Sequence, residues 1–298
     1  MRSVVADDMS ALTRRLTLAA LSIALGAALC PTVVTGSADA AAAYAPAATA
    51  RIHPGTQMYT RGAQCTANFV YADGAGHTYV GYAAHCAGTG AATDTDGCKA
   101  ASLPLGTRVT FAEGGNPATE GTAVGRGTLA YSSWLTMKHL GPGAADTCAY
   151  NDLALVRVDA VDVRKVNPSV PFFGGPTGLH TGRVATGDKV YSYGNSSLRS
   201  GVEPVSPKVG AGIGDDAADG GWSHPVYTAT PGIPGDSGSG FLDARGRALG
   251  VLSTVAVAPL PASNGVGDLG KELAFAQSHS GIAGLHLVRG TEPFSPVL

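Results

Sequence analysis

The residues with the clearest chemical potential form a glycine-rich run, Pro231–Gly240, with the sequence PGIPGDSGSG. Within it Ser237 stands between an aspartate and a glycine, which suits a nucleophile on a tight turn. The glycines would let a substrate carbonyl approach the backbone N–H groups of Gly235 and Ser237, which could hold a developing oxyanion. Taken alone, the run is equally typical of a polar surface turn.

A serine hydroxyl is a weak nucleophile and needs a general base that is itself oriented by an acid. His85 follows an apolar stretch and precedes Cys86, and Asp152 opens the apolar run Leu153–Val158. Each of the two alone is more typical of an ordinary half-buried histidine or of a surface aspartate. Together with Ser237 they occur in the chain order His, Asp, Ser, which is one of the orders known for catalytic triads. We therefore predict a triad of base His85, orienting acid Asp152 and nucleophile Ser237.

Four blocks of the sequence resemble the trypsin/chymotrypsin-like serine proteases of the secreted bacterial type. They are Tyr79–Cys86, Asn151–Val158, Pro234–Gly240 and Gly250–Ser253, and the resemblance spans residues 55–278. The family implies an all-β fold of two six-stranded antiparallel β-barrels with a short C-terminal helix. It implies a serine-type endopeptidase that forms an acyl-enzyme on Ser237. It also implies an oxyanion hole from Gly235 and Ser237, and support of Asp152 by Ser253.

The specificity pocket departs from the trypsin-like pattern. Pro231 stands six positions before Ser237, where trypsin-like relatives carry an acidic residue, so a preference for Arg or Lys is not supported. Ile233 replaces a cysteine that often bridges the pocket, and Val255 could narrow the pocket mouth. We expect a substrate-binding face that includes Pro231, Ser253 and Val255, and a small or medium apolar side chain before the scissile bond.

Two other functions remain open from the sequence. The missing pocket bridge leaves room for an esterase, or for a processing protease with one narrow target. A catalytically poor relative that acts by binding proteins is the third possibility, although no triad residue is lost.

Animal-type relatives pair the aspartate before the nucleophile with a new N-terminus. Ile52 lies too close to Cys65 for that arrangement, so we expect Asp236 to be held internally.

The cysteine count indicates disulfides rather than a metal site. Of five cysteines, Cys30 lies in the N-terminal export segment, and an even number, Cys65, Cys86, Cys98 and Cys148, remains. Their spacings lack the close pairs that structural zinc sites use. No metal and no cofactor are predicted. The family resemblance implies a Cys65–Cys86 bridge across the histidine loop, which leaves Cys98–Cys148 as the second.

The N-terminus has the pattern of an export signal. Arg14 and Arg15 precede the apolar run Leu16–Leu29, and the small residues around Ala38–Ala40 fit a cleavage site. The run is too short for a comfortable membrane span. We therefore expect residues 1–40 to be a signal peptide and the mature protein to be secreted without a stable membrane anchor. The route, general or twin-arginine, stays open.

Composition bounds the partners of the mature chain. A formal net charge of −2 with 14% charged residues gives no reason to expect nucleic acid. The expected partner is a protein or peptide substrate, and the protein is expected to be a monomer. Short runs rich in Val, Thr and Tyr, such as Thr66–Tyr71 and Lys189–Tyr193, lie between glycine-rich turns and favour strands.

The order of these signals predicts the organisation of the chain. After the signal peptide we expect a loose N-terminus or short propeptide (41–55), a first barrel (56–165), a linker rich in Pro and Gly (166–182), a second barrel with a C-terminal helix (183–278) and a surface tail (279–298). Asp268 can cap that helix. Its apolar face would contain Leu269, Glu272, Leu273, Phe275 and Ala276.

Overall fold

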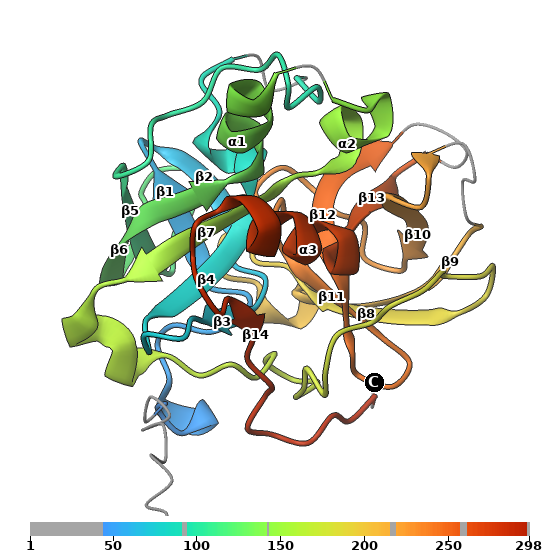
Figure 1. Cartoon of the computed structure of the whole chain (residues 1–298). Coiled ribbons are helices and arrows are strands. Elements are labelled where there is room, and N and C mark those ends of the chain that lie inside the picture. The colour runs from blue at the N-terminus through green and yellow to red at the C-terminus, as the bar shows by residue number, and fades with distance from the viewer. Residues whose placement is uncertain (1–43, 91–93, 142, 215–218, 257–260, 297–298) are drawn as a thin grey trace, which may run out of the picture. The chain divides into compact units, whose positions relative to one another are not determined.

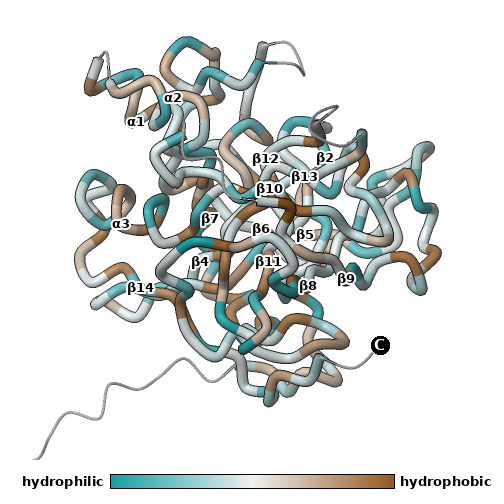
Figure 2. The backbone as a smooth tube through the Cα atoms, turned by 90° about the vertical axis from the view of Figure 1, so that its right-hand side faces the viewer, coloured by the Kyte–Doolittle hydropathy of each residue, from teal (hydrophilic) through white to brown (hydrophobic). Residues whose placement is uncertain are grey.

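The structure is a computed structural model, and it describes residues 44–90, 94–141, 143–214, 219–256 and 261–296 (Figure 1). The expected signal peptide, residues 1–40, lies outside the described residues. Strands dominate the described part and form two sheets, which confirms the all-β expectation. Hydrophobic segments recur along the strands of both sheets, between more hydrophilic connections (Figure 2).

The first sheet is curled and has eight strands in the order β14-β3-β4-β7-β6-β5-β1-β2, each antiparallel to its neighbours. Its strands are β1 (Gln57–Thr60), β2 (Ala63–Thr66), β3 (Val70–Ala72), β4 (Thr78–Ala83), β5 (Arg108–Glu113), β6 (Thr122–Ser132), β7 (Leu153–Val158) and β14 (His286–Leu287). All six residues of β4 and five of the six in β7 are buried, as continuous apolar strands require. These two central strands carry the predicted base and acid at their ends.

The second sheet is a closed barrel in the order β10-β13-β12-β11-β8-β9. Its strands are β8 (Lys189–Tyr193), β9 (Pro207–Gly212), β10 (Ser223–Thr228), β11 (Gly240–Asp243), β12 (Ala248–Ala256) and β13 (Ser263–Asp268). Alternate side chains fill its interior with a small apolar core: Val184, Val190, Val226, Phe241, Leu249, Leu252 and Val266. This barrel has the six strands expected. The first sheet has eight strands, two more than the expected barrel.

Helices are few in the described residues. They are α1 (Ser133–Leu140), α2 (Ala145–Tyr150) and α3 (Leu269–His279), with short 3-10 turns η1 (Ala47–Thr49), η2 (Ala84–Ala87), η3 (Ala160–Lys165), η4 (Ser197–Arg199) and η5 (Glu203–Val205). The C-terminal helix α3 begins as predicted, because the Asp268 side chain accepts a hydrogen bond from the Lys271 N–H at 2.7 Å. None of the described helices is long and apolar enough to cross a membrane.

Two terminal segments differ from the sequence expectation. Residues 44–55, expected to be loose, are fixed because Ile52 is fully buried and its N–H donates to Lys165 O at 3.0 Å. The tail is more than a surface extension, since His286 pairs with Ala72 and so adds β14 beside β3. The expected strand 66–71 is also interrupted: the chain leaves sheet pairing between β2 and β3.

Candidate active site

Neighbouring strand ends bring His85 and Asp152 together. His85 lies in η2, directly after β4, and Asp152 directly precedes β7. Because Ala83 and Leu153 are register partners in this antiparallel pair, the residues that follow one strand and precede the other must be adjacent. The Ala84 N–H donates to Asp152 O at 2.8 Å, which locks the two turns to each other.

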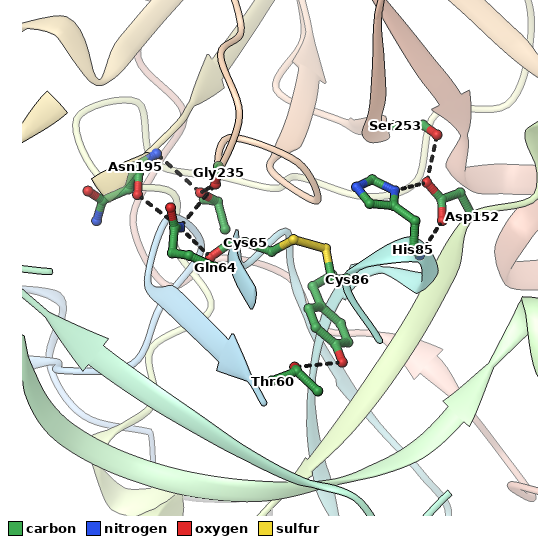
Figure 3. Close-up of a disulfide and its surroundings, with 11 residues drawn as sticks. Thr60, Gln64, Cys65, His85, Cys86, Asp152, Asn195, Gly235 and Ser253 are labelled. Atoms are coloured by element: carbon green, nitrogen blue, oxygen red, sulfur yellow. Dashed lines mark hydrogen bonds and ion pairs between the residues drawn. A yellow bond between two sulfur atoms is a disulfide. The ribbon is translucent and has the colours of Figure 1, made fainter. Parts of the chain in front are cut away.

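The Asp152 carboxylate is buried and accepts three hydrogen bonds (Figure 3). Its Oδ1 accepts from the His85 backbone N–H at 2.8 Å, and its Oδ2 lies 2.6 Å from His85 Nδ1. The Ser253 hydroxyl, on β12 of the barrel, donates to the same Oδ2 at 2.6 Å. An ionised carboxylate at this position holds the imidazole proton on Nδ1, so Nε2 is left as the acceptor.

The electrostatics of His85 follow from the same contacts. Burial disfavours the imidazolium, but the charge of Asp152 and its hydrogen bond outweigh burial and raise the pKa of His85 above its ordinary value. The side chain remains 26% exposed, so a substrate or solvent can reach it. The indole of Trp134, on α1, lies with its ring centroid 6.3 Å from the imidazole centroid and walls one side of the site.

Ser237 lies in a turn that packs against the first sheet. Its carbonyl accepts from the Thr66 N–H at 2.8 Å, and the next N–H, of Gly238, donates to Leu252 O at 2.7 Å. Gly238 has a φ of 88°, and a Cβ there would lie 2.8 Å from Ala83 N, so only glycine fits this approach. The turn therefore sits against the strand end before His85 and beside the strand of Ser253. No hydrogen bond joins Ser237 Oγ to His85 within the described residues; in substrate-free enzymes this contact is often long.

The turn before the serine is fixed by its own hydrogen bond and by two side chains of β2. The Asp236 N–H donates to Ile233 O at 2.9 Å, and Gly235 has a φ of 94°, which is the type II pattern that needs glycine at the third position. The carbonyl of Gly235 accepts from Gln64 Nε2 at 3.0 Å (Figure 3). It also accepts from Thr66 Oγ1 at 2.7 Å. In the described part of the chain, the N–H groups of Gly235 and Ser237 donate to no other residue.

Asp236 is buried with two cations that the sequence reasoning did not identify. Its Oδ2 lies 2.6 Å from Arg199 Nη2 and 3.1 Å from Lys208 Nζ, and its Oδ1 accepts from the Ser196 N–H at 3.0 Å. The Lys208 side chain is fully buried, which lowers its pKa despite the opposing charge of Asp236. Both cations also donate to Pro231 O, at 3.1 Å each. A buried aspartate demands a partner, but its identity depends on loops far apart in sequence.

Of the residues expected at the substrate-binding face, Val255 lies beside Gly232, which follows Pro231, whereas Ser253 contacts Asp152. A Cβ on Gly232 would lie 3.2 Å from Leu252 Cδ2 and 3.4 Å from Val255 Cγ2. The Gly232 N–H donates to Asn264 Oδ1 at 3.1 Å, which ties this loop to β13. Val255 is 46% exposed, so it lies at the surface with its side chain against the loop that starts at Pro231.

The four remaining cysteines form two disulfides, Cys65–Cys86 and Cys98–Cys148. The first joins β2 to the turn that carries His85 (Figure 3), and the second joins the segment between η2 and β5 to α2. Two clusters in the described residues have the spacing of metal ligands, but both depend on these cysteines. Sulfurs bonded to each other are not thiolate ligands, so neither cluster is a candidate metal site.

No family model matches the sequence, and no curated protein matches it. Among solved structures, Thermobifida fusca protease A is similar, with 19% identity and a TM-score of 0.47 over 80% of this chain and 99% of that chain. A Nocardiopsis protease shares 17% identity, with a TM-score of 0.46 over 79% and 98%. A Glu endopeptidase in complex with MPD shares 18% identity, with a TM-score of 0.46 over 77% and 94%.

The topology of the chain itself is more informative. A curled antiparallel sheet is followed by a closed six-stranded barrel and by the C-terminal helix α3. The two antiparallel sheets and the C-terminal helix follow the order that the sequence resemblance implied, with an eight-stranded curled sheet in the place of the first six-stranded barrel.

Proposed function

We propose that this chain is a secreted serine endopeptidase that hydrolyses peptide bonds through His85, Asp152 and Ser237. Ser237 Oγ attacks the scissile carbonyl while His85 Nε2 takes its proton, and His85 then returns the proton to the leaving amine. Asp152 holds the imidazole and stabilises the imidazolium. In the second half of the reaction, water attacks the acyl-enzyme while His85 takes its proton. His85 then returns this proton to Ser237 Oγ as the acid product leaves. No cofactor takes part in these steps.

One observation carries the proposal: the Asp152 carboxylate accepts from the backbone and Nδ1 of His85 and from Ser253. These three bonds fix both the ring orientation and the tautomer that a general base requires. The close approach of Gly238 to Ala83 supports the placement of the adjacent Ser237 near this histidine. Among the described residues, the N–H groups of Gly235 and Ser237 have no acceptor, which supports their proposed role in holding an oxyanion.

The substrate is proposed to bind as an extended strand with a small apolar side chain before the scissile bond. Beyond Leu252, the described part of β12 pairs only with β13, so its other edge is open to a peptide backbone. The short distances between the position of a Gly232 Cβ and the side chains of Leu252 and Val255 favour a shallow pocket. A peptide library cleaved mainly after Arg, Lys or a bulky aromatic residue would contradict this specificity.

Export is proposed from residues 1–40, and the two disulfides are compatible with an oxidising compartment. Expression of the full chain in a bacterial host, followed by N-terminal sequencing of protein from the medium, tests this step. We expect a mature N-terminus after about residue 40, as small-residue cleavage sites predict. Protein kept inside the cell with the segment intact would argue against export.

The enzymatic proposal is tested with Ser237→Ala on a mixed peptide library. Loss of the nucleophile is expected to lower kcat by about 10⁴-fold or more, with unchanged thermal unfolding. Ser239→Ala is the matched control, because Ser239 lies in the same turn and its buried hydroxyl has no hydrogen-bond partner among the residues that the structure describes. It should keep full turnover. If Ser237→Ala hydrolysed peptides at the wild-type rate, the mechanism would be wrong.

A further inference from the structure

A carboxyl group that the proposed mechanism does not use lies directly behind the triad. Glu272, in the first turns of α3, is fully buried. Its Oε1 accepts a hydrogen bond from the backbone N–H of Asp152 at 2.9 Å. This contact spans 120 residues of sequence and joins the C-terminal helix to the acid of the triad.

The neighbouring strand makes room for this side chain. A Cβ on Gly267, in β13, would lie 2.6 Å from Glu272 Oε1, closer than real atoms approach. Any larger residue at position 267 would push the carboxyl group away from Asp152. The geometry is therefore specific: Gly267 on the barrel leaves the space in which Glu272 Oε1 accepts from the Asp152 N–H.

That N–H needs the acceptor. Asp152 lies between α2 and β7, outside regular structure, and in the described structure its N–H donates to Glu272 alone. A buried backbone donor left without a partner is costly, and the chain would move to find one. A shift of the Asp152 backbone would also move its carboxylate, which holds His85 and Ser253 at 2.6 Å.

We propose that Glu272 is a positioning residue of the triad, which fixes the backbone of Asp152 from α3 through its Oε1 acceptor. This inference rests on the proposed serine-protease function. It adds a residue outside the three triad positions and outside the substrate pocket, and it gives α3 a role in the active site.

The charge of Glu272 decides how it acts. Burial raises the pKa of the carboxyl group well above its ordinary value, although the bond from the Asp152 N–H opposes this. Nearby charges of Asp152 and Asp268 raise it further, and the phenols of Tyr71 and Tyr131 also face it. No cation is among these groups. Burial and the two neighbouring carboxylates therefore favour the uncharged form of Glu272, which accepts this hydrogen bond without adding charge beside His85.

The test compares Glu272→Gln with Glu272→Leu. Glutamine keeps an oxygen acceptor of the same length, so its kcat and pH profile should match wild type. Leucine keeps the volume and removes the acceptor, and we expect kcat to fall about tenfold with an unchanged KM. Equal losses in both variants would mean that the ionisable carboxyl group is required, which overturns the neutral-acceptor role. A Leu variant with wild-type kcat would overturn positioning itself.

Stability effects are separated by a variant on the same helix. Leu273, next to Glu272, is buried but is not part of the triad network. Leu273→Ala should lower the melting temperature as large-to-small core changes do, while kcat of the folded fraction stays at the wild-type value. A kcat loss in Leu273→Ala equal to that in Glu272→Leu would show that any weakening of α3 has this effect, and the specific role of Glu272 would be rejected.

A second readout does not require catalysis. NMR titration of His85 measures its coupling to Asp152 in folded protein, even if no peptide is hydrolysed. Glu272→Leu should lower the pKa of His85, because a displaced Asp152 stabilises the imidazolium less; Glu272→Gln should leave it unchanged. An inactive wild type with this pattern would refute the protease function and keep the positioning role. An unchanged His85 titration in the Leu variant would refute the positioning role alone.

Discussion

Two buried aspartates flank the proposed reaction centre, and their partners differ in kind. Asp152 accepts from a titratable ring, a hydroxyl and a backbone N–H, and the carboxyl group of Glu272 accepts from its own N–H. Asp236 contacts two basic side chains, Arg199 and Lys208, as well as backbone N–H groups. Both are nearly inaccessible to solvent.

The difference indicates that the charge of Asp152 serves the proposed reaction, whereas the charge of Asp236 serves the structure. A carboxylate beside an imidazole gains most when the ring becomes charged, which is the moment at which a general base has taken a proton. A carboxylate paired with cations is stabilised at all times, so it suits a turn that must not move. The turn before Ser237 is therefore held by Asp236, while Asp152 stays responsive to His85.

The largest effect is expected when the responsive aspartate is replaced. Asp152→Asn keeps the shape but offers an amide N–H to His85, which favours the wrong tautomer. We expect kcat to fall about 10⁴-fold with a small change in melting temperature. Steady-state kinetics and thermal unfolding measure both. If Asp152→Asn had a much lower melting temperature but its folded fraction kept the wild-type kcat, the roles assigned to the two aspartates would be reversed.

The opposite pattern is expected for the structural aspartate. Asp236→Asn leaves Arg199 and Lys208 buried beside a neutral amide, and breaking a buried ion pair in this way costs about 3–5 kcal/mol of unfolding free energy. Denaturant unfolding measures the loss. The control is Glu113→Gln, which breaks the exposed pair with Arg51 and should leave the transition midpoint unchanged. A fully stable Asp236→Asn protein would show that the cations do not depend on this carboxylate.

The smallest effect is a shift on the pH axis. Since Asp152 raises the pKa of His85 above 6.5, kcat/KM should rise with pH through a midpoint above 6.5. The same raised pKa means that the contribution of this pair to stability is complete below about 6.5 and is lost as pH rises through the folded-state value. Asp152→Asn should move this rise of kcat/KM, the acidic limb of the profile, to lower pH. A profile without an acidic limb would remove His85 as the base.

Sequence reasoning succeeded where the signal is local. The glycines around Ser237, the apolar run after Asp152 and the capping Asp268 are each readable within a few residues. The short runs rich in Val, Thr and Tyr favoured the all-β class that the family resemblance implied. The sequence also placed Glu272 on the buried face of that helix. It could not show that Glu272 meets Asp152, because the contact depends on how the helix packs against β7.

The residues that were missed all act over long distances in the chain. Arg199 and Lys208 lie in separate segments and reach Asp236 only in the folded protein. Trp134 belongs to the eight-residue helix α1, which is too short for a clear helical period. The two-residue strand β14 is shorter still, and alternation cannot reveal it. These elements are decided by tertiary packing, which no local pattern encodes.

The central claim is that Ser237 is an activated nucleophile, and a fluorophosphonate probe tests it most directly. Purified mature protein with both disulfides intact would be labelled and the modified residue located by mass spectrometry, beside Ser237→Ala and Ser239→Ala. The account predicts one adduct, on Ser237, which is absent from the first variant and present in the second. A folded wild-type protein that stays unlabelled, or that carries the probe on another residue, would contradict it.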